Sequence, residues 1–153
     1  MRMLLLSTAL IALIGPALAQ DAIKPTMVTP DTLTWQDAKA LPKGAQFTIL
    51  MGDPTKAGEV FVQRVKLPPN YQVPAHIHPY AETATVISGT VYFGMGEKLD
   101  MQNGTMLKAG SFYAMPPRHA HYAWTTDEGV IVQIQATGPS GIEYINPADD
   151  PRK

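Results

Sequence analysis

The sequence predicts a single all-β domain, either a barrel or a sandwich. Short apolar or alternating segments follow one another at near-regular spacing, and none has the periodicity of an amphipathic helix. The 12 glycines and 14 prolines mainly occupy the expected turns between these segments. The chain of 153 residues is long enough for one domain with a real core, and only 16% of its residues are charged. About nine short strands are expected.

Residues 1–19 are predicted to be a cleaved signal peptide. Arg2 supplies a positive charge, residues 3–14 form an apolar run, and Ala17-Leu18-Ala19 matches a signal-peptidase site. The alternative is an N-terminal membrane anchor, for which the apolar run is short. We therefore expect cleavage after Ala19, a mature chain that begins at Gln20, and a secreted or periplasmic protein that has no membrane contact after cleavage.

The mature chain divides into an N-terminal extension with the first strands (20–56), a barrel (57–146) and a polar tail (147–153). In the extension, Pro and Thr predict an extended lead-in, and Trp35 is expected to pack the following segment onto the barrel. Clusters of Gly, Pro, Asn and Asp mark where the first apolar segments end. The first strands are expected at residues 47–51, 59–67 and 71–78.

The rest of the barrel is predicted from alternation and from turn signals. Residues 81–88 alternate polar and apolar side chains, as a half-buried strand does, and Ser88-Gly89 predicts a turn into the next strand. Asn103-Gly104 is a strong hairpin signal. Gln133 is expected to face a pocket, since polar and apolar residues alternate around it. The remaining strands are expected at residues 90–95, 111–115, 119–125, 130–137 and 141–145.

All four histidines lie in two His-x-His pairs, His76 with His78 and His119 with His121. Residues i and i+2 of a strand point to the same face, so each pair can present two imidazoles to one ion. Glu82 follows the first pair and can return toward it after the chain turns. Neutral imidazole and carboxylate are suitable ligands for a divalent first-row metal. A lone histidine is more often structural, but two pairs beside a glutamate predict a metal site.

Composition argues against several other functions. The net charge is −1 and no polybasic stretch is present, which argues against nucleic acid or anionic lipid as a partner. Without cysteine, the chain can form no disulfide, thiolate ligand or cysteine nucleophile. Met95 and Met115 offer a copper(I) site as an alternative, although methionine more often fills gaps in a core.

The two histidine motifs resemble those of the cupin superfamily. The positions in register with the family's motifs are His76, His78, Glu82, Gly89, Gly110, Pro116 and His121. Asn70 and Arg118 stand where the motifs have glycine, and Thr125 stands where the second motif ends in asparagine. The resemblance covers about residues 57–138. It implies a small double-stranded β-helix, a jelly-roll-like barrel that is often dimeric.

The resemblance also implies one metal ion held by His76, His78, Glu82 and His121. Such a ligand set leaves open positions on a six-coordinate ion and favours Fe(II) or Mn(II), with Ni, Zn or Cu also possible. His121 is preferred over His119 as a ligand because the family spacing from Pro116 selects it.

The expected function is a metal-dependent enzyme of oxygenase or lyase type that acts on a small organic acid or an enol-like molecule. Decarboxylase and isomerase activities also occur among cupins, so the reaction stays open. Arg118, His119 and Tyr80 are the candidates for contacting the substrate or moving a proton. The alternative is a carrier that binds a metal or a small ligand without turnover.

Overall fold

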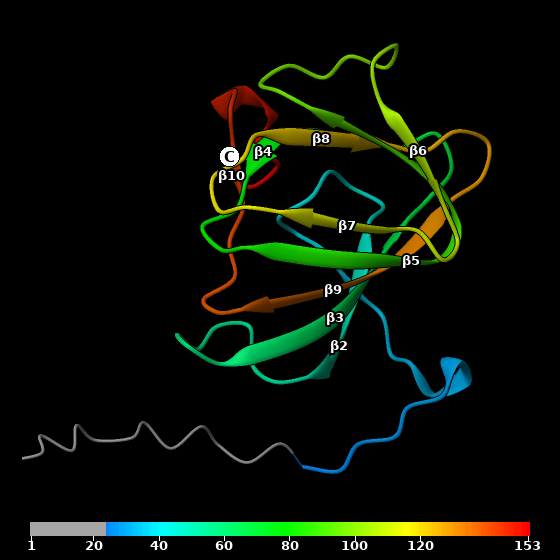
Figure 1. The fold of residues 1–153 in the computed structure, drawn as a ribbon, viewed down its shortest axis with the longest axis vertical. Coiled ribbons are helices and arrows are strands. Elements are labelled where there is room, and N and C mark those ends of the chain that lie inside the picture. Colours follow the sequence, from blue (N-terminus) through cyan, green and yellow to red (C-terminus); the bar gives the residue numbers. More distant parts are fainter. Residues whose placement is uncertain (1–23) are drawn as a thin grey trace, which may run out of the picture.

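The computed structural model describes residues 24–153, so the predicted signal peptide and its cleavage site lie outside the described residues. Two antiparallel sheets curl around a common interior (Figure 1). The strands are β1 Gln36–Asp37, β2 Gln46–Met51, β3 Val60–Leu67, β4 Gln72–Ile77, β5 Glu82–Met95, β6 Thr105–Lys108, β7 Phe112–Met115, β8 His121–Trp124, β9 Val130–Thr137 and β10 Glu143–Tyr144.

Residues 24–153 contain only two short 3₁₀ helices, η1 (Pro30–Thr32) and η2 (Pro147–Asp149). Within this part of the chain, no helix has the length and apolarity that a bilayer span requires.

Strand β5 belongs to both sheets. Its first half pairs with β9 and β7, and its second half pairs with β8 and β6. The first sheet therefore has the order β1-β2-β3-β9-β5-β7, and the second has the order β6-β5-β8-β4-β10. Two sheets that share a long strand in this way form a double-stranded β-helix, and the predicted fold is confirmed.

The turn predicted at Ser88-Gly89 is wrong, because the chain bends there without reversing. The pairing of β5 with β9 shifts between Val86 and Ser88, which marks a β-bulge. Gly89 has a φ of +75°, and a Cβ at this position would lie 1.9 Å from the carbonyl oxygen of Gly129. Pairing on both sides of β5 thus overrides the local turn signal, and glycine permits the bend.

The main core lies between the two sheets. Along β9, the buried residues Val130, Val132, Ile134 and Ala136 alternate with more exposed ones. Residues of β3 and β5 face them from neighbouring strands. Full burial of each valine or isoleucine side chain stabilises the fold by about 1.5–3 kcal/mol. A smaller cluster around Tyr122 and Trp124 packs on the outer face of the second sheet.

The expectation that Gln133 faces the pocket is wrong. Its side chain accepts a hydrogen bond from Arg64 Nε at 3.1 Å, while Val132 and Ile134 line the interior. Alternation correctly predicts two faces of β9, but the register with β3 and β5 turns the apolar face inward.

Residues 38–43, which we call the seam segment, connect β1 to β2 beside the last strands of the second sheet. The Tyr144 hydroxyl donates to the carbonyl oxygen of Ala40 at 2.8 Å, and the Tyr71 hydroxyl donates to that of Pro42. Apolar side chains of the segment pack against the core. Trp35 precedes the segment and lies under the Lys66 ammonium, 5.7 Å from it. The seam segment therefore connects the edge of the first sheet, at β1 and β2, to β10 and the start of β4 in the second sheet.

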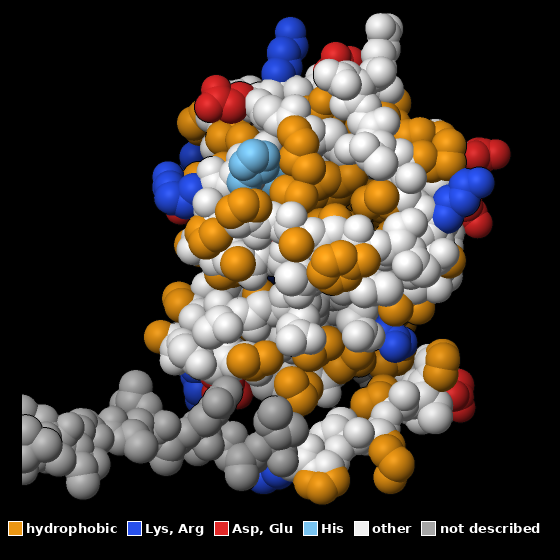
Figure 2. Space-filling view, viewed as in Figure 1, with side chains coloured by type: hydrophobic (Ala, Val, Ile, Leu, Met, Phe, Trp, Pro, Cys, Tyr) orange, Lys and Arg blue, Asp and Glu red, His pale blue; other side chains and the backbone are white. Residues whose placement is uncertain are grey.

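On the face drawn in Figure 2, Lys and Arg side chains stand apart from one another and gather in no basic patch. Several of them have Asp or Glu nearby, and much of the face carries uncharged side chains. This distribution agrees with the low charge of the sequence.

Candidate metal centre

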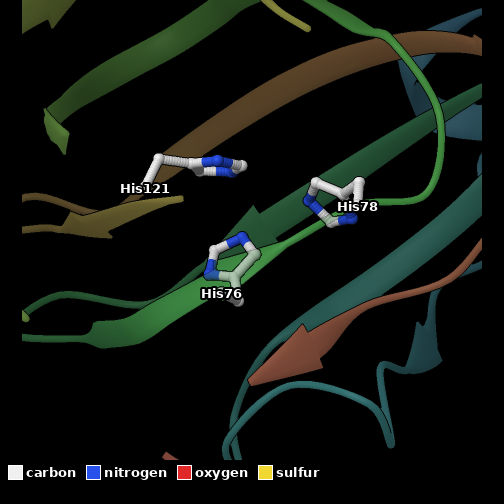
Figure 3. Close-up of side chains that lie close together, drawn as sticks. All are labelled: His76, His78 and His121. Carbon is white, nitrogen blue, oxygen red and sulfur yellow. The ribbon is translucent and has the colours of Figure 1, made fainter. Parts of the chain in front are cut away.

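Three histidines meet at a cavity of about 390 Å³ between the sheets. His76 lies in β4, His78 follows the end of β4, and His121 begins β8. Their rings point toward one another (Figure 3), and one nitrogen from each lies within 4.8 Å of the others. The centroids of the His76 and His121 rings are 4.3 Å apart. The spacing is that of ligands around one ion.

Strand pairing produces this arrangement. His76 and His121 are direct partners in the antiparallel pairing of β4 with β8, and Tyr144 of β10 pairs with His76 on the other side. The pairing of β4 with β8 shifts between Val73 and His76, so a bulge precedes the first histidine. Bulges change the direction of nearby side chains and are common beside functional sites.

Backbone carbonyl groups determine the tautomer of each histidine. The Nδ1 atoms of His76, His78 and His121 lie 2.7, 2.6 and 2.8 Å from the carbonyl oxygens of Pro74, Gly141 and His119, respectively. A carbonyl oxygen can only accept, so each Nδ1 carries the hydrogen. In the neutral rings, all three Nε2 atoms then keep a free lone pair. Such outer contacts are typical of histidines that bind a metal.

Glu82 lies beside His78 with only 3% of its surface exposed, outside the group of three histidine nitrogens that lie within 4.8 Å of one another. Its Oε1 accepts a hydrogen bond from the Tyr113 hydroxyl at 2.8 Å. Its Oε2 lies 3.0 Å from His78 Nε2 but has no hydrogen-bond partner among the described residues. The lone pairs of His78 Nε2 and Glu82 Oε2 repel each other at this distance unless a proton or a metal ion lies between them. A buried carboxylate without a compensating charge or hydrogen bond also destabilises the fold. The donor set therefore fits a divalent cation.

The charges of the centre agree with this interpretation. Burial lowers the pKa of His76 to about 3, and burial also lowers the pKa of His121. Burial acts to lower the pKa of His78 as well, but the adjacent Glu82 carboxylate outweighs it and raises that pKa. For Glu82, burial acts to raise the pKa, but His78 outweighs it and lowers the pKa. In the metal-free protein, the favoured place for a positive charge is thus between His78 and Glu82.

The structure separates the three residues predicted to contact a substrate. Tyr80 lines the cavity and stacks on His78, with ring centroids 5.1 Å apart. Arg118 and His119 are exposed, and neither lines the cavity. The Arg118 guanidinium points to Glu143 instead, at 3.7 Å. Of the three, only Tyr80 is placed where it can touch a bound molecule.

The copper alternative has no geometric support, because neither Met95 nor Met115 lines the cavity. Met115 is buried in the core, and Met95 is exposed.

Several residues that line the cavity are not among the site residues predicted from the sequence. Tyr113 reaches it from β7 and orients Glu82, and Gln63 reaches it from β3. Arg152 reaches it from the predicted polar tail and is bound to Asp150 through Nε at 2.7 Å. Lys39 reaches it from the exposed part of the seam segment. The alternation of side chains along a strand predicts that Gln63 and Tyr113 each lie on one of its two faces. No local feature of the sequence shows which of these faces points into the interior.

Fold and site together define a double-stranded β-helix protein with a buried three-histidine centre at one end of its interior. Residues 63–134 match the family model described as a cupin domain. This part of the chain is a cupin domain. None of the curated proteins matches the chain in sequence.

Solved structures share this fold at low sequence identity. The polyketide cyclase RemF from Streptomyces resistomycificus is 15% identical, with a TM-score of 0.69, covering 84% of this chain and 91% of its own. An uncharacterised double-stranded β-helix protein from Klebsiella pneumoniae is 22% identical, with a TM-score of 0.59, covering 78% and 96%. An oxalate oxidase is 23% identical, with a TM-score of 0.54, covering 69% of this chain and 57% of its own. At these identities the likeness is one of fold.

Proposed function

We propose that the protein is a metal-dependent enzyme that acts on a small organic molecule. His76, His78, His121 and Glu82 would hold one divalent transition metal ion, with Fe(II) or Mn(II) as the first choice. The observation that carries the proposal is the convergence of three Nε2 lone pairs beside a buried carboxylate oxygen that has no hydrogen-bond partner within residues 24–153. When bound, the ion would supply a Lewis-acidic or redox-active centre with positions open to a substrate.

The chain's own residues support this role. The Tyr113 hydroxyl holds Glu82 by one oxygen and leaves the other directed at His78. Tyr80 lies beside His78. Burial, and to a smaller extent the negative charge of Glu82, raises the pKa of Tyr80, so the Tyr80 hydroxyl keeps its proton at neutral pH. Tyr80 is therefore the candidate to donate a hydrogen bond or a proton to a bound oxygen. Apolar side chains over most of the cavity exclude water from the reacting molecule.

The cavity favours an enzyme over a protein that only carries metal. A metal carrier needs the ligands alone, whereas about 390 Å³ of space beside them has the size of a site for a small molecule. Oxygenase or lyase chemistry fits the ligand set, and the similar solved structures include a polyketide cyclase and an oxalate oxidase. The family resemblance also supports a homodimer.

The test is reconstitution with Fe(II) under anaerobic conditions, followed by exposure to nitric oxide. One equivalent of bound iron and the electron paramagnetic resonance signal of an iron–nitrosyl complex are expected, because nitric oxide needs an open position on the metal. The variant Glu82→Gln should bind less iron. A protein that binds no metal would refute the proposal, and a bound metal that does not react with nitric oxide would favour a carrier.

We further propose that the enzyme acts after export. The supporting observation is the signal-peptide pattern of residues 1–19. Intact-mass measurement of protein from the producing cell should show a chain that begins at Gln20. A mass that retains residues 1–19 would contradict this proposal.

A further inference from the structure

Gln63 is a polar side chain in an otherwise apolar part of the cavity wall. It projects from β3 on the same face as Phe61, Val65 and Leu67, which are all buried. Gln63 itself is half-buried and lines the cavity. Its amide makes no hydrogen bond to any of the described residues 24–153. An amide in such a wall costs stability unless a ligand or water satisfies it.

The sheet register places Gln63 close to the metal end. Gln63 pairs with Ile134, Ile134 pairs with Ala84, and Ala84 pairs with Tyr113, so these residues form one row across four strands. Glu82 lies two residues before Ala84 on β5, which is about 7 Å along a strand. Gln63, Ile134 and Tyr113 of this row line the same cavity as Glu82. A single-ring molecule bound at the metal end can therefore extend to the layer of Gln63.

The charge of the cavity limits what such a molecule can carry. A divalent ion with Glu82 as its one anionic ligand leaves a single positive charge, which one anionic oxygen neutralises. Around Gln63 the wall consists of aliphatic side chains such as Val65 and Ile134. No cationic side chain of β3 or β9 faces this part of the cavity, so a second anionic group there would be buried without a partner on these strands. Lys39 is exposed, and Arg152 is already bound to Asp150.

We propose that the substrate is a ring-sized, largely apolar molecule with one ionisable chelating group at the metal end and a neutral hydrogen-bonding group that Gln63 recognises. This inference rests on the proposed metal centre and deepens it. It selects an enol-like substrate over an organic diacid. Gln63 determines specificity by contact with the substrate, without ligating the metal.

The test uses the cobalt(II)-loaded protein, whose visible absorption reports the binding of a chelator. Three probes share the same hydroxypyrone chelating group and differ only in the substituent opposite: allomaltol carries a methyl group, kojic acid a hydroxymethyl group and comenic acid a carboxylate. Because the chelating group is constant, differences in Kd report the environment of the substituent. Kojic acid should bind roughly two- to tenfold more tightly than allomaltol, and comenic acid should bind most weakly.

The variant Gln63→Leu should reverse the preference for kojic acid over allomaltol while its cobalt content stays that of the unaltered protein. Gln135→Leu is the matched control, since Gln135 is exposed on β9 beside Ile134 and outside the cavity lining. It should keep the order of the three probes. Comenic acid as the tightest probe would overturn the neutral substrate, and an unchanged order in Gln63→Leu would overturn the role of Gln63. Failure to bind cobalt would instead refute the metal centre itself.

Discussion

The two His-x-His pairs have the same spacing but different structures. Both members of the first pair, His76 and His78, line the cavity. In the second pair only His121 does, and His119 is exposed to solvent. Equal spacing in the sequence thus yields two inward side chains in one place and a single inward side chain in the other.

The difference arises where each pair meets its strand. His76 lies inside β4, and the hydrogen bond to Gly141 directs the ring of His78 just after that strand ends. His119 lies before β8, after a turn in which Arg118 has a φ of +58°. The rule that residues i and i+2 share a face applies within a strand and fails across such a turn. His119 still supports the centre, because its carbonyl oxygen accepts from His121 Nδ1 at 2.8 Å.

The largest expected effect comes from comparing the members of the second pair by mutation. His121→Ala should weaken metal binding by at least ~100-fold, because it removes a ligand rather than an outer contact. His119→Ala should change it by less than about threefold, because the supporting contact comes from the backbone. Metal titration of both variants measures the effect, and thermal melting with and without metal gives an independent reading. Loss of metal in His119→Ala with retention in His121→Ala would contradict the assignment of His121 as the ligand.

The first pair differs internally in its response to pH. Glu82 raises the pKa of His78 above its usual value, whereas burial lowers the pKa of His76. As pH falls, His78 is therefore the first to gain a proton, which a metal ion must displace. Metal affinity should be highest above the pKa of His78 and should fall by about tenfold for each pH unit below it. Equal affinities at pH 5 and pH 8 would contradict a site built on histidine.

The Tyr113 hydroxyl holds Glu82 through a side-chain hydrogen bond, whereas backbone carbonyl oxygens hold the three histidines. Tyr113→Phe removes the hydrogen bond to Glu82 Oε1 and frees the carboxylate to rotate. Metal affinity should fall by about tenfold with the ligands intact. Tyr80→Phe is the control, since Tyr80 packs on His78 and makes no such bond to Glu82. Equal affinities in both variants would show that Tyr113 does not position the glutamate.

The smallest effect concerns the turn that separates the members of the second pair. Arg118 adopts the left-handed conformation, which costs a non-glycine residue about 1–2 kcal/mol. Arg118→Gly should raise the free energy of unfolding by up to ~1 kcal/mol, after allowance for the flexibility of glycine. The exposed contact with Glu143 contributes little. Denaturant unfolding measures the change, with Arg118→Ala as the variant that keeps the left-handed cost. A less stable Arg118→Gly variant would contradict this account.

Local patterns predicted much of the molecule. The sequence predicts strands at 59–67 and 130–137, and the structure has them at Val60–Leu67 and Val130–Thr137. Asn70 and Arg118 replace glycines of the motifs, and both keep a positive φ, of 55° and 58°. The loops therefore keep the conformation that glycine would adopt there. These features depend on neighbouring residues and on single-residue backbone preferences, so the sequence alone could predict them.

The all-β class, the alternation of the strands and the two histidine motifs that resemble those of cupins follow from the amino-acid sequence alone. Three features depend on how the strands pair in three dimensions: β5 bends at Gly89, Gln63 faces the cavity while Gln133 does not, and His119 lies outside the centre. A period of two gives every strand two faces and leaves open which of them is inside. Pairing between strands far apart in the chain makes that choice, because it buries one face of each strand and brings His76 opposite His121.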